Sequence, residues 1–119
     1  MTRERRQFIR TSQPVDLRYR LCGELSAPWT ITRTVNLSAG GARFRCQEPL
    51  RQSDELDLRL QLSGSPRPLE LRACVVWNQM QAAGVNEIGV AFLDVTHEQQ
   101  MQIDALVHFL GQGSFPTAP

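Results

Sequence analysis

Hydrophobic and polar residues alternate along most of this chain with a period of two, which is typical of β-strands that bury one face. The alternation is clearest in residues 55–62, where four leucines are separated by polar residues. Arg33 interrupts the second of the six strands that this pattern predicts. The residues expected to face inward are Val15, Leu17, Tyr19 and Leu21; Trp29, Ile31, Val35 and Leu37; Ala42, Phe44 and Cys46; Leu56, Leu58, Leu60 and Leu62; Leu69, Leu71, Ala73, Val75 and Trp77; and Ile88, Val90 and Phe92.

Turn-forming residues separate these strands. Residues 23–28 predict a turn, residues 38–41 predict a tight turn, and residues 63–68 predict a loop because of their glycine and proline content. Short strands with such connections are typical of a barrel or a sandwich. We favour a barrel because closure removes the exposed edges of so small a sheet. The expected fold is therefore mainly β: a six-stranded antiparallel barrel.

The period changes near the end of the chain, where residues 96–111 predict a helix. Thr96 is a natural N-cap, and Gln99 stands three residues later, at the spacing of a capping box. Ile103, Leu106, Val107 and Leu110 share one helical face, and Gly111 is expected to end the helix. We therefore expect one barrel domain over residues 15–111 and a loose tail over residues 112–119.

Composition narrows the possible functions. The 119 residues suffice for one domain, and no apolar run approaches the ~20 residues of a membrane-spanning helix. The arginine-rich start lacks the apolar region of a secretory signal, so we expect a cytoplasmic protein without direct membrane insertion. A net charge of +1 gives no general attraction to nucleic acid.

The sequence contains few residues that could form a catalytic or metal-binding site. The three cysteines, Cys22, Cys46 and Cys74, share no metal-like spacing and are expected to be reduced residues that pack within strands. Both histidines, His97 and His108, fall in the predicted helix, where surface positions are the simplest interpretation. We therefore expect neither a metal site nor an enzyme.

Two stretches remain as candidate binding motifs. Arginines are concentrated in the first twenty residues, and the simplest interpretation of this cluster is a solvated arm. The stretch NLSAGG is equally consistent with a plain β-turn. Alternatively, Asn36, Ser38 and Gly41 could present an amide, a hydroxyl and an accessible backbone to one ligand. The arginine pair Arg6 and Arg10 precedes the first strand, and NLSAGG ends the second.

In this order the motifs resemble those of the PilZ domain family. The resemblance covers nearly the whole chain, and it also includes VVW at residues 75–77 and GVAF at residues 89–92. PilZ domains are six-stranded barrels that bind the bacterial second messenger cyclic di-GMP (c-di-GMP). The resemblance therefore implies a receptor in second-messenger signalling.

The resemblance also implies roles for individual residues. Arg6 and Arg10 match the paired arginines that grip the guanines and phosphates of the ligand, so residues 1–14 would form a flexible clamp. Asn36, Ser38 and Gly41 match the barrel motif that contacts a guanine and its phosphate. Asn36 replaces the commoner aspartate, which changes an acceptor into a combined donor and acceptor.

Two further residues are assigned in the same way. An arginine at the position of Arg5 goes with binding an intercalated dimer of c-di-GMP rather than one molecule. Trp77 has two interpretations: a tryptophan of the core or barrel rim, or a ring beside the bound guanine.

Alternatives stay open at this point. A degenerate adapter would keep the fold and act by protein contact alone. Nucleic-acid binding through the basic N-terminus is another alternative. Apart from Phe8, however, that segment has no aromatic residues between its arginines on which bases could stack. The sequence identifies no downstream target.

Overall fold

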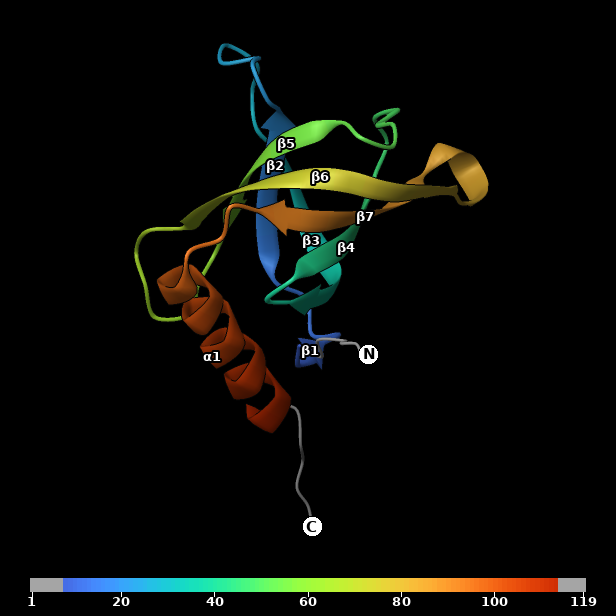
Figure 1. Ribbon diagram of the computed structural model, residues 1–119. Helices are drawn as coiled ribbons and strands as arrows, with labels where there is room; N and C mark the ends of the chain where they lie inside the picture. Colours follow the sequence, from blue (N-terminus) through green and yellow to red (C-terminus); the bar gives the residue numbers. More distant parts are fainter. Residues whose placement is uncertain (1–7, 114–119) are drawn as a thin grey trace, which may run out of the picture.

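Six antiparallel strands close into a barrel because β3 pairs with β2 on one side and with β4 on the other (Figure 1). The computed structural model describes residues 8–113, so the expectations for residues 1–7, including Arg5 and Arg6, and for residues 114–119 lie outside the described residues. The elements are β1 (Arg10–Thr11), β2 (Asp16–Leu21), β3 (Thr30–Ser38), β4 (Gly41–Cys46), β5 (Glu55–Leu60), β6 (Leu69–Met80), a short 3-10 turn (Ala82–Gly84), β7 (Asn86–Leu93) and α1 (His97–Gly113).

The expected six-stranded barrel is confirmed, with one addition. Around the barrel the strands follow the order β3, β2, β5, β6, β7 and β4, and β1 lies outside it, paired with β3. Two residues are too few to show a period, which is why the alternation did not reveal β1.

The barrel interior is filled mainly by the predicted inward-facing residues of β2, β4, β5 and β7 and by those of β6 as far as Val75. Leu17, Leu56, Leu60 and Phe44 are among the most deeply buried. Helix α1 lies against β1 and β3 and buries Ile103, Leu106 and Val107 in the same core. The described residues contain no helix that is both long and apolar enough to span a membrane.

The capping box of α1 is confirmed in both directions. The backbone N–H of Gln99 donates to Thr96 Oγ1 at 3.1 Å, and the backbone N–H of Thr96 donates to Gln99 Oε1 at 3.1 Å. The predicted helix end at Gly111 was two residues early, because α1 continues to Gly113.

The predicted inward face of β3 was wrong in its first half. Ile31 is 69% exposed and Thr34 is buried, because Val35 is an extra residue that shifts the register of β3 against β4. Such a β-bulge reverses which side chains face the core. Arg33 therefore lies on the outer face, where its Nε is 3.1 Å from Asp16 Oδ1. The interruption seen in the sequence is a surface ion pair.

Trp29 is also not a core residue. Its ring lies under two guanidinium groups, with the Cζ atoms of Arg20 and Arg59 at 4.3 and 4.2 Å from the ring centroid. Guanidinium over an indole face is a favourable cation–π arrangement. Trp29 thus stabilises the charged outer face rather than the core.

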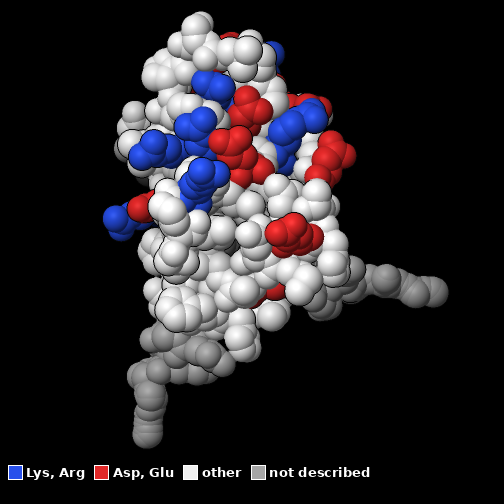
Figure 2. Space-filling view, turned by 90° about the vertical axis from the view of Figure 1, so that its left-hand side faces the viewer, with Lys and Arg blue, Asp and Glu red and all other residues white. Residues whose placement is uncertain are grey.

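Both signs of charge are interleaved on that outer face (Figure 2). Arg72 Nη2 is 2.7 Å from Glu55 Oε1, and Arg59 Nε is 3.5 Å from Glu70 Oε2. Pairs of this kind cancel one another locally, so this face offers little net attraction to an anion.

Candidate ligand-binding site

A hollow of about 200 Å³ on the outside of the barrel brings together the predicted site residues that the structure describes. Arg10 comes from β1, Asn36 and Ser38 from the end of β3, Gly41 from the start of β4, and Trp77 from β6. The remaining lining residues are Ala42, Arg43, Val76, Gly89 and Val90. Residues separated by more than sixty positions in sequence therefore share one surface.

Arg10 is positioned by the pairing of β1 with β3. It lies opposite Ser38 in the register, and Thr11 lies opposite Leu37. Thr11 is buried whereas Arg10 is exposed, so the strand alternation holds Thr11 against the protein and directs Arg10 outward.

Ser38 ends β3 and begins the predicted tight turn. Its hydroxyl oxygen accepts a hydrogen bond from the backbone N–H of Gly40 at 3.1 Å. The backbone oxygen of Gly40 in turn accepts from Phe92 N–H at 3.0 Å, which ties the turn to β7. The Ser38 hydroxyl is thus fixed by its own turn and keeps its proton for donation to a ligand.

Gly41 is required by the barrel itself. A Cβ atom there would lie 2.1 Å from the backbone oxygen of Val90, on the neighbouring strand β7. Any side chain would force β4 and β7 apart. The last glycine of NLSAGG therefore has a structural reason to be glycine, whatever it also offers a ligand.

Trp77 lies on the outer surface, not on the inward face of β6. Val76 is an extra residue between two paired positions, Val75 and Trp77, and this bulge turns Trp77 outward. The indole is 36% exposed and rests on Gly89, where a Cβ atom would lie 2.3 Å from the ring. The inward assignment of Trp77 was wrong, and the ring is available beside the hollow.

Strand pairing aligns four of the lining residues in one row. Trp77 pairs with Gly89, Gly89 with Arg43, and Arg43 with Asn36, from β6 across β7 and β4 to β3. Neither Arg43 nor Gly89 was predicted as a site residue from the sequence. The alternation of β4 shows that Arg43 points outward, but only the strand order shows which residues lie beside it.

Positive charge dominates the lining of the hollow. Among residues 8–113, the charged residues that line the hollow are Arg10 and Arg43, and no Asp or Glu of that part of the chain lines it. Arg43 is paired with a carboxylate outside the lining: Glu87 Oε2 is 3.3 Å from Arg43 Nη1, and Glu87 Oε1 is 3.6 Å from Arg45 Nε. One carboxylate shared by two guanidinium groups leaves a net positive charge, which favours an anionic ligand.

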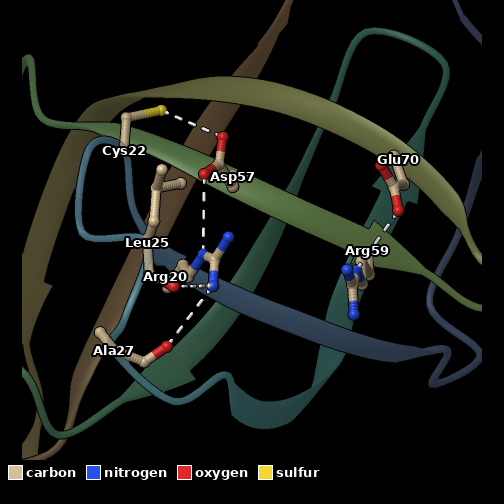
Figure 3. A network of polar contacts seen from close by, with 7 residues as sticks. All are labelled: Arg20, Cys22, Leu25, Ala27, Asp57, Arg59 and Glu70. Carbon is tan, nitrogen blue, oxygen red and sulfur yellow. Dashed lines mark hydrogen bonds and ion pairs between the residues drawn. The ribbon is translucent and has the colours of Figure 1, made fainter.

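A second hollow, of about 360 Å³, differs in its electrostatics. It lies over β2, β5 and β6, and its lining includes Trp29, Arg20, Asp57 and Arg59. Figure 3 shows Arg20 directed at Asp57 and at backbone oxygens of the following turn, and Arg59 directed at Glu70. These arginines already have partners, so this hollow is the weaker candidate for an anion.

The thiol of Cys22 belongs to this second region. Cys22 follows β2 rather than lying within a strand, and its Sγ lies 3.3 Å from Asp57 Oδ1. Burial and the neighbouring Asp57 carboxylate raise the pKa of the Cys22 thiol, so it stays protonated and unreactive at neutral pH. Within residues 8–113 no group of three or more His, Cys, Asp or Glu side chains is arranged to hold a metal ion.

Comparison with known proteins agrees with this architecture. The family model of the PilZ domain matches residues 4–109. The chain is similar to the structure of the Bacillus subtilis inhibitor of motility MotI/DgrA, with a TM-score of 0.74 and 18% identity over 94% of this chain and 53% of that chain. It is also similar to the PilZ domain of YcgR from Escherichia coli, whose structure contains c-di-GMP, with a TM-score of 0.68 and 16% identity over 93% of this chain and 95% of that chain.

A third similar structure is the PilZ domain of CeSA from a cellulose-synthesizing bacterium, with a TM-score of 0.61 and 18% identity over 86% of this chain and 97% of that chain. The chain thus spans about half the length of MotI/DgrA but nearly all of the two isolated domains. No curated protein matches it in sequence.

Proposed function

The chain belongs to the PilZ domain family, and we propose that it is a cytoplasmic receptor for c-di-GMP in bacterial second-messenger signalling. The observation that carries this proposal is the convergence of Arg10, Asn36, Ser38 and Trp77 on one hollow, to whose lining the described residues contribute no carboxylate. The c-di-GMP in the YcgR structure supports the choice of ligand.

The chemistry of the hollow suits a dianionic purine dinucleotide. c-di-GMP carries two phosphates and two guanines, and each guanine presents its O6 and N7 acceptors side by side. A guanidinium fork matches those acceptors or two phosphate oxygens, a match that an ammonium group cannot make. Arg10 would supply such a fork, the Ser38 hydroxyl a donor, and the Trp77 ring a surface against which a base can stack.

The hollow itself holds only part of such a ligand. Its volume of about 200 Å³ is below the usual ~300–1,000 Å³ of small-molecule pockets. We propose that the N-terminal segment, with Arg5 and Arg6, closes over the ligand and completes the site. In this arrangement Arg5 favours an intercalated dimer of c-di-GMP, because added positive charge offsets the repulsion among four phosphates.

The receptor would pass its signal to a protein target by contact rather than by catalysis. The competing proposal, an adapter that keeps the fold and does not bind nucleotide, has no observation in its favour beyond the small size of the hollow.

Isothermal titration calorimetry of the full chain with c-di-GMP tests the proposal. GMP is the control, since it carries the same base with one phosphate and cannot bridge both halves of the site. We expect saturable binding of c-di-GMP and far weaker binding of GMP. Absence of binding to c-di-GMP at high ligand concentration would contradict the receptor and favour the adapter.

A further inference from the structure

Arg43 occupies the middle of the row that crosses the candidate site. Its register partners are Asn36 on one side and Gly89 on the other, and the Trp77 ring rests on that glycine. Adjacent strands are about 4.8 Å apart, so the Arg43 backbone lies about one strand spacing from the residue that the indole covers. A base stacked on Trp77 would therefore present an edge within reach of the Arg43 side chain.

The guanidinium of Arg43 is oriented in advance by Glu87. The Glu87 side chain is only 10% exposed, and Arg43 uses Nη1 to pair with it at 3.3 Å. A guanidinium has five N–H donors, so this ion pair leaves most of them free for a ligand. Arg43 remains 43% exposed at the edge of the hollow, which leaves those donors accessible.

From these contacts we infer that Arg43 is a specificity-determining residue of the site: it reads the O6 and N7 acceptors of the guanine that stacks on Trp77, and Glu87 is its positioning residue. This inference rests on the proposed function. It adds to the site an arginine of β4 that belongs neither to the arginine pair nor to NLSAGG. Adenine presents a donor in place of O6, so it would lose one of the two hydrogen bonds.

Arg45 provides a matched control within the same cluster. It shares the Glu87 carboxylate, at 3.6 Å, and lies two residues along the same strand. It is exposed, but it is not among the residues that line the hollow. Replacing either arginine removes one of the two partners of Glu87, and only replacement of Arg43 removes a donor facing the ligand.

The test compares the affinities of c-di-GMP and cyclic di-AMP for the unaltered chain, Arg43→Ala, Arg43→Lys and Arg45→Ala, with melting temperature measured for each. We expect Arg43→Ala to lower c-di-GMP affinity about tenfold or more and to reduce the preference for guanine over adenine. Arg43→Lys should keep the charge without restoring that preference. Arg45→Ala should bind within about twofold of the unaltered chain.

Three outcomes would overturn the inference while leaving the proposed function intact. Arg43→Ala could bind like the unaltered chain, Arg45→Ala could lose as much affinity as Arg43→Ala, or Arg43→Lys could fully restore the base preference. Failure of the unaltered chain to bind c-di-GMP would instead contradict the proposed function, and this inference with it.

Discussion

Arg10 lies directly opposite Ser38 across the pairing of β1 with β3. This backbone pairing places the end of the N-terminal arginine segment beside Ser38, the first residue of the Ser38–Gly41 turn. It needs no ligand to do so. A contact between Phe8 and Gly40 reinforces this pairing. The Phe8 ring lies so close to Gly40 that a Cβ atom added to Gly40 would be 2.8 Å from the ring. The last part of the proposed clamp is therefore already seated beside the barrel motif.

The arginine pair should matter for binding and little for folding. We expect Arg6→Ala and Arg10→Ala each to abolish useful c-di-GMP binding, because each removes a fork that grips the ligand. Arg10 is exposed, so its replacement should change the free energy of unfolding by less than about 0.5 kcal/mol. Calorimetric titration and thermal unfolding measure the two effects.

The control is Arg67→Ala, at an exposed arginine of the 63–68 loop, which should change neither c-di-GMP affinity nor stability. Wild-type affinity in both variants would remove the arginine pair from the site.

Ser38 has two roles that substitution can separate. Ser38→Ala removes the acceptor of the Gly40 N–H, which should cost about 1 kcal/mol of stability, and it should weaken c-di-GMP binding less than Arg10→Ala does. Ser38→Thr keeps the hydroxyl and should recover most of both losses. Urea unfolding and titration of the two variants would contradict this account if Ser38→Thr behaved like Ser38→Ala.

Gly41 should be needed for folding before it is needed for binding. Gly41→Ala sets a methyl group against the Val90 backbone oxygen, so we expect a loss of about 1–3 kcal/mol in the free energy of unfolding. Gly111→Ala is the matched control, because a Cβ atom there has no neighbour within 4 Å and alanine favours a helix. Equal stability of the two variants in urea would show that β4 can move away from β7 without cost.

Arg5 should set the number of bound ligands. A guanidinium can offset phosphate repulsion and stack on an exposed guanine, so we expect two c-di-GMP molecules per chain. Arg5→Leu should shift the ratio towards one. The stoichiometry comes from the same titration, carried out at protein concentrations well above the dissociation constant. A ratio of one for both proteins would show that Arg5 has no part in ligand stacking.

The sequence predicts the barrel well because most strands keep a strict alternation. Leu56, Leu58 and Leu60 face inward as their spacing requires, and Thr96 and Gln99 form the reciprocal cap that their spacing predicts. Local rules of this kind need no knowledge of the neighbouring strands.

The errors arise where one extra residue enters a strand. Val35 and Val76 each add a residue that the partner strand does not match, and every side chain beyond such a bulge changes face. Trp77 was therefore assigned to the wrong side. Arg43 was missed for a different reason: its place beside Asn36 and Gly89 depends on strand order, which alternation within one strand does not contain.

The two tryptophans provide the most direct test of where the ligand binds, because Trp77 lines the proposed site and Trp29 lines the other hollow. The measurement is a titration with c-di-GMP followed by the indole N–H resonances in ¹⁵N–¹H NMR spectra, assigned with Trp29→Phe. We predict that the Trp77 resonance moves to saturation together with the backbone amides of residues 36–43, while the Trp29 resonance stays in place. Movement of Trp29 with Trp77 unchanged would contradict the account and put the ligand in the hollow lined by Trp29.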